Sequence, residues 1–416
     1  MGSRCERLSR RSFLASLAAA ASMVGCAPRI QLGSQNSSQD LPIPGECGID
    51  HIVLVMMENR SFDHLLGWLP GANGKQAGLS FPDRSGQLQL THHLTDFQGC
   101  GFQDPNHSYS GGRAEYDNGN CDGWLQVNDT YSIGYYEQSD LAFLGSAAPG
   151  WTVCDNYFAA TLSETTPNRF YQHAAQTDRL SDTPDLTTLP TIWDLLQNAG
   201  LTGKYYYNNF RVLSFWGTKY DGISHAYSEF LTDCAAGNLS QVSFIDPIFG
   251  DGSGEFTTDD HPHGDIRNGE AFLNQVYQAV TCGPKWPRTL LIINFDEWGG
   301  FYDHVPPPTA PIPLADQLAG NVDGRLGFRT PALLIGRWAR RNHISHIQFD
   351  HTSVLKLIEW RWGLPALTIR DATSNNLALA LDFQRPNLFA PVYAVPTGPF
   401  GARCVQAQSR PIRRLS

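Results

Sequence analysis

The sequence predicts one α/β domain in which strands and helices are stacked in layers. Short apolar segments rich in β-branched residues alternate with amphipathic segments along most of the chain, and this alternation is typical of a single layered domain. Two of the apolar segments, 51–57 and 289–295, run directly into acidic or amide side chains. In open α/β sheets, ligands bind beyond the carboxyl ends of the strands, so we expect both polar ends to lie at one site.

The predicted elements follow one another in a regular order. Strand 51–57 opens the fold, and a short helix begins at Phe62 and reaches Leu69. Residues 70–150 are rich in Gly, Asn, Asp and Tyr and have little periodicity, so we expect long functional loops there. Residues 210–260 show mixed patterns and yield no assignment. The remaining predicted elements are the helices 167–180, 188–200, 269–281 and 351–364 and the strands 201–209, 289–295 and 329–339.

The composition excludes several classes of protein. Of the 416 residues, 41% are hydrophobic and 17% are charged, as in an ordinary globular protein. The formal net charge of −10 argues against a nucleic-acid partner, because phosphates require a basic face, and against docking on anionic lipid by charge alone. No apolar segment approaches the roughly 18 residues that a membrane span needs.

The first 26 residues predict an export signal. Arg10 and Arg11 precede a short apolar segment with small residues, which is typical of a signal read by the twin-arginine export machinery. We therefore expect the protein to be periplasmic or secreted. Met23–Cys26 also resembles a lipoprotein cleavage box, so two outcomes are open: lipidated Cys26 anchors the protein to the outer membrane, or cleavage near Ala27 releases it.

The rest of the chain divides into three parts. A polar, proline-bearing linker covers 27–46, a single domain covers 47–404 and a basic tail covers 405–416. Two of the nine cysteines lie in the signal, and the other seven contain no C-x-x-C pair, which argues against a zinc ribbon. Export permits up to three disulfides among those seven, with a pairing that the sequence does not determine.

Acidic and amide side chains end the two central strands. Glu58 and Asn59 follow the strand 51–57, and Asp296 and Glu297 follow the strand 289–295. These hard oxygen donors suit a divalent cation, with Ca, Mg and Mn favoured by hardness and Zn also compatible with carboxylates. For either pair taken alone, a turn that caps the strand is the structural alternative.

A third polar segment, Ser163–Arg169, leads into a predicted helix. Pro167 is expected at the first helical position, which makes Thr166 the N-cap. Free backbone amides and the helix dipole favour an anion here, so Thr165 is available to contact a phosphate. The structural alternative is that the threonines only cap the helix.

Five motifs together resemble those of one known family. They are ENRSFDHLLG at 58–67, TTPNRF at 165–170, DDHPHGDIRNGEAF at 259–272, FDEWGGFYDHVPPP at 295–308 and FDHTSVLKLIEW at 349–360. They resemble the bacterial and plant phosphoesterase family, which contains the non-specific phospholipases C and related acid phosphatases. The resemblance implies an alkaline-phosphatase-like α/β fold, with a central, mostly parallel sheet sandwiched between helices and with long active-site loops.

The resemblance also implies a set of site residues. In this family the Glu-Asn pair, the nucleophile and the Asp-Glu pair surround a divalent metal ion. The matching residues here are Glu58, Asn59, Thr165, Asp296 and Glu297. Thr165 matches the nucleophile, which would form a covalent phosphothreonine. Family histidines contact the phosphate or protonate the leaving group; His261 and His304 match such positions well, and His107 is a looser match.

Several neighbouring side chains have structural interpretations. We expect Asp63 to brace its loop, and Arg169 to be either a salt-bridge partner or a phosphate contact. Asp303 either orients His304 or caps the turn before the prolines. We expect His351 to brace the N-terminus of a helix rather than to bind a ligand.

Three functions fit these residues. The first is an exported phospholipase C that hydrolyses the glycerol-side phosphodiester of phospholipids such as phosphatidylcholine, with transient membrane-surface contact through aromatic loops in 97–136 and 205–230. The alternative is an acid phosphatase of the same family, which would use the same core on phosphomonoesters. A third is an exported binding or adhesion module without catalysis. A sulfatase is not expected, because the C-x-P-x-R motif is absent.

Overall fold

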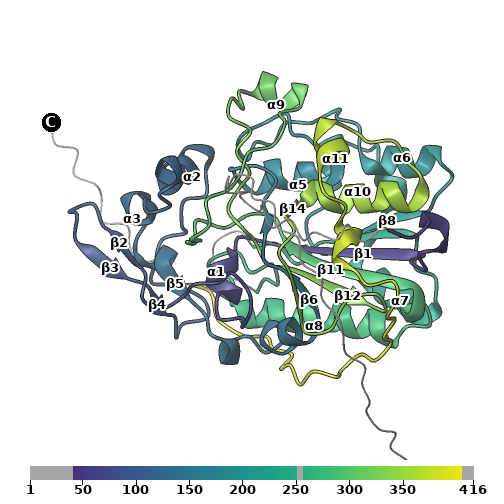
Figure 1. Ribbon diagram of the computed structural model, residues 1–416, viewed down its shortest axis with the longest axis horizontal. Coiled ribbons are helices and arrows are strands. Elements are labelled where there is room, and N and C mark those ends of the chain that lie inside the picture. The colour runs from purple at the N-terminus through teal and green to yellow at the C-terminus, as the bar shows by residue number, and fades with distance from the viewer. Residues whose placement is uncertain (1–40, 251–255, 405–416) are drawn as a thin grey trace, which may run out of the picture. The chain divides into compact units, whose positions relative to one another are not determined.

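One large sheet forms the centre of the computed structural model, which describes residues 41–250 and 256–404 (Figure 1). Its eight strands lie in the order β13-β6-β12-β11-β1-β10-β8-β9. Their bounds are β1 His51–Met57, β6 Thr152–Cys154, β8 Gly203–Tyr207, β9 Ser224–Ala226, β10 Val242–Ile245, β11 Thr289–Phe295, β12 Ala332–Gly336 and β13 His343–Ser345. Strand β12 is antiparallel to both neighbours, and the other pairs are parallel. The predicted mostly parallel α/β sheet is therefore confirmed.

Helices cover both faces of the sheet, as predicted (Figure 1). On one face lie α5 Thr165–Ala174, α6 Ile192–Asn198, α10 His351–Trp362 and α11 Ile369–Thr373. On the other face lie α7 Tyr227–Ala236 and α8 Ile266–Cys282. Helix α8 presents a buried apolar stripe at one-turn spacing, formed by Phe272, Val276 and Val280. This stripe explains why a helix forms directly before strand β11.

The two central strands are buried on both faces. Val53 and Val55 of β1 and Ile292 and Ile293 of β11 have no exposed surface. Strands covered by helices on both sides are expected to be continuously apolar, which is how these segments read in the sequence. The two strands pair in parallel along their whole length, from His51 opposite Thr289 to Met57 opposite Phe295.

The long segment between β1 and β6 contains short elements separated by loops. Its helices are α1 Phe62–Leu66, α2 Tyr109–Tyr116, α3 Trp124–Val127 and α4 Leu144–Ala147. Its strands form two small sheets, β2 Ser80–Pro82 with β3 Leu88–Leu90 and β4 His92–His93 with β5 Gly134–Tyr135. Elsewhere, β7 Tyr157–Phe158 pairs with β14 Phe349–Asp350, and α9 Leu314–Ala319 follows the proline-rich loop.

Helix α5 differs from its prediction at both ends. It begins at Thr165 with Glu164 as N-cap, so the prediction of Thr166 as N-cap is wrong and Pro167 is the third helical residue. The Thr166 N–H donates instead to the Asp182 carboxylate at 2.7 Å, a partner that local spacing does not reveal. The helix ends at Ala174, because Ala175 adopts a left-handed conformation with φ of 55°.

Several elements lie in the segment 210–260 that the sequence left unassigned. Strand β9, helix α7 and strand β10 fill part of it, and β10 pairs with β1 at the centre of the sheet. Strand β10 has only four residues, which is too short for a periodic signal to stand out. Helix α6 also begins later than predicted, at Ile192, because Thr191 and Asp194 form a capping box there.

Some predictions concern residues that the structure does not describe. The export signal, Cys26, the linker up to Asp40 and the tail from Val405 all lie outside the described residues. Among the described residues, Cys100 and Cys404 form a disulfide. The free thiols are those of Cys47, Cys121, Cys154, Cys234 and Cys282. In this same part of the chain, no helix has both the length and the apolar character to cross a membrane.

Truncating a central strand tests this account of the core. We expect Ile293→Ala to lower the free energy of unfolding by about 2–5 kcal/mol, because Ile293 is wholly buried and its removal leaves a cavity. Denaturant unfolding of the purified protein measures the change. Leu88→Ala is the matched control, since Leu88 is 63% exposed and its loss should cost less than about 0.5 kcal/mol. Equal losses in both variants would contradict the assignment of the core.

Candidate active site

Three adjacent strands deliver carboxylates to one edge of the sheet. Strand β1 lies between β10 and β11 and is parallel to both. Glu58 follows the end of β1, Asp246 follows the end of β10 and Asp296 follows the end of β11. Because the strands run in the same direction, all three side chains lie at their shared carboxyl edge, where α/β sheets bind ligands.

Arg169 of α5 connects these three carboxylates. Its Nε lies 3.0 Å from Asp296 Oδ2, its Nη1 lies 2.8 Å from Asp246 Oδ1 and its Nη2 lies 3.4 Å from Glu58 Oε1. The side chain is only 3% exposed, and Nη2 also donates to the backbone carbonyls that end β1. The interpretation of Arg169 as a salt-bridge partner is therefore confirmed, and Arg169 fixes the relative positions of the three strand ends.

Asn59 and Glu297 each keep one oxygen without a partner. Asp296 Oδ1 accepts from the backbone N–H groups of Asn59 at 3.2 Å and Glu297 at 2.7 Å. Glu297 Oε2 accepts from the Gly299 N–H at 2.5 Å, while Glu297 Oε1 and Asn59 Oδ1 are buried and have no hydrogen bond from any described residue. Buried oxygens of this kind are costly unless a ligand satisfies them.

His107 determines how the Asn59 amide is oriented. Its Nδ1 lies 2.8 Å from the Pro105 carbonyl and must therefore carry a proton, which leaves Nε2 as an acceptor for Asn59 Nδ2 at 3.3 Å in the neutral ring. The amide oxygen then points away from His107. The backbone of Asn59 is left-handed, with φ of 58°, and a side chain at Gly299 would meet the Asn59 carbonyl at 2.1 Å. This turn therefore requires glycine at 299.

The electrostatics of the cluster favour a cation. Burial raises the pKa of Glu58 and of Glu297 well above their ordinary values, and the negative charge of Asp296 raises both further. Burial also raises the pKa of Asp296 to about 6, against the opposing effect of Arg169. The oxygens of Asn59 and Glu297 that have no partner among the described residues are hard donors suited to a divalent cation, which would offset the crowded negative charge. Among the same residues, the acidic or histidine groups of three whose ligand atoms all lie within 4.8 Å of one another are Asp104-His107-His261 and Asp63-Asp303-His304, and not Glu58, Asp296 and Glu297.

Thr165 lies beside this cluster in a pocket of about 560 Å³. Its polar lining residues include Glu58, Thr165, Thr166, Arg169, Asp182 and His261, and its aromatic ones are Phe210, Phe215 and Phe249, whose ring lies under the Arg169 guanidinium. Thr165 is the first residue of α5, where the helix dipole favours an anion, although the next N–H group, that of Thr166, already donates to Asp182 and Pro167 has none. The pocket therefore combines an anion-attracting helix end, a partly exposed hydroxyl and apolar rings.

A second group of donors lies next to the first. Asp104, His107 and His261 each offer a ligand atom, and these atoms all lie within 4.8 Å of one another. His261 Nδ1 hydrogen-bonds the Pro262 carbonyl, which leaves Nε2 facing Asp104 Oδ2 at 3.8 Å. The charge of Asp104 contributes to the raised pKa of Glu297, so the two groups influence each other electrostatically.

His304 lies apart from this pocket. Its Nδ1 contacts Asp63 Oδ2 at 2.5 Å and its Nε2 lies 3.1 Å from Asn73 Oδ1. Among the described residues, no hydrogen bond or ion pair joins His304 to Thr165 or to the predicted metal ligands. Arg329 pairs with both Asp63 and Asp303, so its guanidinium already neutralises these two carboxylates.

These contacts decide between the two roles considered for Asp303. Asp63 holds the ring of His304, whereas Asp303 accepts from the Val305 N–H at 2.9 Å and so caps the turn before the prolines. His351 is buried at the start of α10, and its Nε2 lies 2.7 Å from the Asp296 carbonyl. It therefore braces the helix start and the Asp296 turn, as expected.

Sequence reasoning missed two carboxylates of the site. Asp246 carries the same signal as Glu58 and Asp296, an apolar strand that ends in an acid, in the segment Val242–Asp246. That signal was available but lay in a segment of mixed pattern. Asp104 lies in a loop without periodicity, and only the fold brings it beside His107 and His261.

Comparisons with known proteins show which sequences and structures this chain is similar to. The profile of the Phosphoesterase family matches residues 49–365. "Phospholipase C B" of Mycobacterium tuberculosis strain H37Rv is 31% identical over 427 residues, covering 83% of this chain and 80% of that protein. "Non-specific phospholipase C1" of Arabidopsis thaliana is 30% identical over 383 residues, covering 81% and 71%. A crystal structure of an alkaline phosphatase superfamily protein from Vibrio parahaemolyticus aligns at 12% identity and a TM-score of 0.39, covering 79% of this chain and 70% of that chain.

Removing the central guanidinium tests its role. We expect Arg169→Met to lower the free energy of unfolding by about 3–5 kcal/mol, because it leaves three buried carboxylates without their cation. Arg113→Met is the matched control: Arg113 pairs with Asp323 at 2.8 Å near the surface, where a salt bridge contributes about 0–1 kcal/mol. Denaturant unfolding compares the two, and a loss at Arg169 no larger than at Arg113 would refute the bridging role.

Proposed function

The chain belongs to the Phosphoesterase family, and from that premise we propose that it is an exported phospholipase C. It is a phosphoric ester hydrolase, and its proposed reaction is hydrolysis of the glycerol-side phosphodiester of phospholipids such as phosphatidylcholine, which yields diacylglycerol and a phosphorylated head group. One observation gives this proposed reaction its main support. Thr165 at a helix N-terminus, Glu58 from the end of β1, His261 and Arg169, which also binds Asp296, all border one pocket.

The walls of the pocket favour a phospholipid over a small phosphomonoester. Phe210, Phe215 and Phe249 line the pocket together with its charged residues, and such a lining suits a substrate with both a phosphate and apolar chains. Relatives that are about 30% identical carry phospholipase C names. An acid phosphatase of the same family would use the same polar residues of the pocket and would not need the phenylalanine rings.

Thr165 acts as the nucleophile in this proposal. Its hydroxyl oxygen forms a bond to phosphorus while the bond from phosphorus to the diacylglycerol oxygen breaks, which gives a phosphothreonine. The Thr165 N–H and the dipole at the start of α5 favour the phosphoryl oxygens as negative charge develops on them. Water then attacks phosphorus, releases the phosphorylated head group and regenerates Thr165.

His261 and His107 assist on the other side of the phosphate. With a proton on Nε2, His261 can donate it to the departing diacylglycerol oxygen, and the nearby Asp104 carboxylate stabilises the charged ring. His107 orients Asn59 and presents no proton on Nε2 in its neutral form. His304 has no part in these steps, because its ring is held by Asp63 and Asn73.

The residues that would hold a divalent cation are Glu58, Asn59, Thr165, Asp296 and Glu297. When bound, a cation at these oxygens lowers the pKa of the nucleophilic hydroxyl and draws charge from a phosphoryl oxygen. Arg169 keeps Glu58 and Asp296 in place for this role. The oxygen-rich donors favour Ca, Mg or Mn, and the imidazoles of His107 and His261 nearby make Zn a fourth candidate.

Export and lipid contact complete the proposal. The signal at 1–26 would carry the folded protein out through the twin-arginine machinery, to the periplasm or medium or to the outer membrane through lipidated Cys26. Phe210 lines the pocket and is 43% exposed, so it is suited to transient contact with a phospholipid surface.

The reaction itself is tested first. We expect the metal-loaded mature protein to cleave phosphatidylcholine vesicles to diacylglycerol much faster than a soluble aryl phosphomonoester. Product analysis by chromatography measures the first reaction and absorbance measures the second. Turnover of the monoester alone would assign the acid phosphatase function instead. Absence of turnover on both substrates with each of Ca, Mg, Mn and Zn would favour a non-catalytic binding module.

Two neighbouring threonines test the nucleophile. We expect Thr165→Ala to lower kcat by at least about 10³-fold, because the attacking oxygen is lost. Thr166→Ala is the matched control, since Thr166 lines the same pocket and is the next residue of the same helix. It should retain activity within about tenfold. The reverse result, with Thr166→Ala inactive and Thr165→Ala active, would move the nucleophile by one residue.

A third test addresses the cation. Treatment with a chelator should abolish hydrolysis, and restoring one of the four metals should recover it. Glu297→Gln should weaken metal binding by at least about tenfold, because it removes a negative ligand. Elemental analysis and metal titration measure this change, with the exposed Glu46→Gln as control. Full activity in chelator, or unchanged affinity in Glu297→Gln, would contradict the proposed ligands.

A further inference from the structure

Helix α9 carries its leucines on the side that faces solvent. Leu314 and Leu318 are 70% and 80% exposed, whereas Asp316 between them is wholly buried. At about 100° per residue, Asp316 lies on the opposite side of this short helix from the two leucines. A surface helix normally turns its apolar side to the core and its charged side to water, so the polarity of α9 is inverted.

Asp316 fixes α9 in this orientation. Its Oδ1 accepts from the Tyr171 hydroxyl of α5, and its Oδ2 accepts from the Thr177 N–H at 3.0 Å. Its backbone carbonyl accepts from the Asn321 N–H at 2.9 Å, which closes the end of the helix. The leucines therefore cannot turn toward the core unless these hydrogen bonds break.

Val322 extends the exposed apolar surface past the end of α9. It is 83% exposed and follows the left-handed turn at Gly320, where φ is 99°. Figure 1 shows α9 at the top of the view, standing out beyond α5. Single exposed apolar residues are ordinary, but several that lie together on a protruding segment mark an interaction surface. The name apolar ridge is used below for Leu314, Leu318 and Val322.

The apolar ridge lies close to the candidate active site. Asp323, the residue after Val322, pairs with Arg113 of α2 at 2.8 Å. Arg113 also donates to the Leu162 carbonyl at 3.1 Å. Leu162 comes three residues before Thr165, which lines the pocket. Two contacts therefore join the end of the ridge to the segment that leads into the candidate nucleophile.

The charges around the ridge favour a partner without net charge. Residues 314–322 contain no cation, and the acids beside the leucines and beside Val322 are already bound to α5 and to Arg113. The whole chain carries a formal net charge of −10, which disfavours an anionic lipid surface. A second copy of the chain is also disfavoured: α9 is only about 9 Å long, whereas stable protein interfaces bury about 1,200–2,000 Å².

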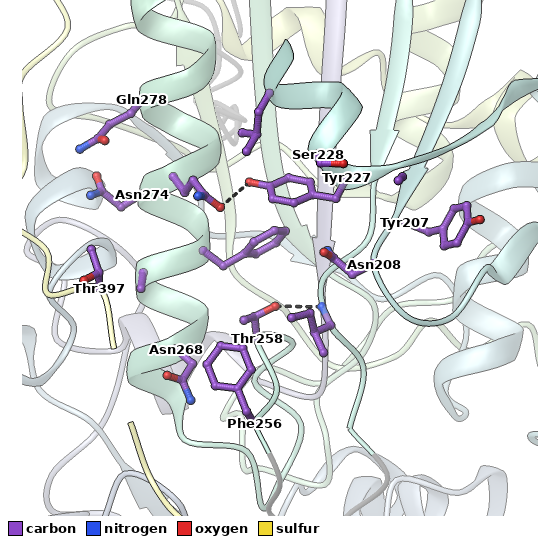
Figure 2. A pocket seen from close by; sticks show the side chains of 16 residues that line it. Tyr207, Asn208, Tyr227, Ser228, Phe256, Thr258, Asn268, Asn274, Gln278 and Thr397 are labelled. Carbon is purple, nitrogen blue, oxygen red and sulfur yellow. Dashed lines mark hydrogen bonds between the residues drawn. The ribbon is translucent and has the colours of Figure 1, made fainter. Parts of the chain in front are cut away.

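A second pocket, of about 620 Å³, is not an alternative entry for a phospholipid (Figure 2). Asn208 and Ile248 line it, whereas the next residues, Asn209 and Phe249, line the candidate active site, so one wall of chain divides the two pockets. Of the described residues that border the second pocket, none carries a formal charge. It therefore supplies no cation for the phosphate of a head group.

We propose that the apolar ridge docks on the surface of a zwitterionic phospholipid membrane. The two leucines and Val322 leave water for the boundary between head groups and acyl chains, as the apolar side of an interfacial helix does. Docking there holds the start of α5 near the lipid that is to be hydrolysed. The inference rests on the proposed function for its choice of partner, because a phospholipase C meets its substrate in such a surface.

Vesicle binding by the full mature protein tests the docking site. The probe is phosphatidylcholine vesicles, and co-sedimentation measures binding in the Thr165→Ala protein, so that hydrolysis does not consume the vesicles. We expect the ridge variant Leu314→Gln/Leu318→Gln, in that background, to weaken vesicle binding at least about tenfold, because two leucine side chains no longer leave water on docking. Glutamine is a good helix former, so α9 should persist in the variant.

Phe389→Gln/Val392→Gln is the matched control. These two side chains are 71% and 89% exposed. Between them, the Pro391 carbonyl accepts from the Tyr277 hydroxyl of α8, which covers the sheet face opposite α5. The control should bind vesicles as tightly as the parent protein. With Thr165 restored, ridge variant and control should both hydrolyse dissolved dihexanoyl phosphatidylcholine at the unmutated rate, because a substrate below its micelle concentration needs no docking.

Four results would overturn the inference. They are no vesicle binding by the parent protein, equal weakening in the ridge variant and the control, a dimer in sedimentation that the ridge variant dissociates, and a lowered Tm of the ridge variant, which would show that the leucines pack on another part of the chain. Vesicle binding that depends on the ridge, without hydrolysis of either phosphatidylcholine, would refute only the proposed function. Hydrolysis of vesicles with binding that the ridge variant retains would refute only this inference.

Discussion

The buried guanidinium of Arg169 is the contact on which the site depends. Three parallel strands end in carboxylates at one edge, and without a cation between them these acids would be driven to neutrality by burial and mutual repulsion. Arg169 is suited to the position because its planar fork reaches three acceptors at once and stays charged at any physiological pH. Its backbone is fixed by α5, the helix that also carries Thr165. One side chain therefore connects the helix that carries Thr165 to the strand ends.

Arg169 does not bind every oxygen of the cluster. Arg169 satisfies Asp246, one oxygen of Asp296 and one of Glu58, but it does not reach the free oxygens of Asn59 and Glu297. Around His304, Arg329 pairs with both Asp63 and Asp303, and ligand atoms of these two carboxylates and of His304 lie within 4.8 Å of one another. Both clusters therefore contain an arginine that neutralises carboxylates. They differ in that Asn59 and Glu297 keep oxygens without a partner among the described residues.

The two pockets differ in the charge of the residues that line them. The candidate active site is charged and faces aromatic rings, whereas its neighbour is lined by amides and rings without formal charge. The shared wall is short and held by paired hydrogen bonds between Asn209 and Phe249. Because each residue of an extended segment alternates its side chain between two sides, a single wall can present different side chains to each pocket.

The sequence alone determined the central strands and the polar pairs that end them, because buried parallel strands have an unmistakable apolar pattern and the acids follow immediately. It also determined α8 and α10, whose apolar periodicity is strong, and the family, through motifs spread over most of the chain. Only the tertiary structure decided that Asp182 holds the Thr166 N–H, that Asp246 and Asp104 join the site, and that His304 pairs with Asp63 away from the pocket. These contacts join residues from 16 to 241 positions apart. Local spacing carries no information about such pairs, because strand order and loop packing bring them together.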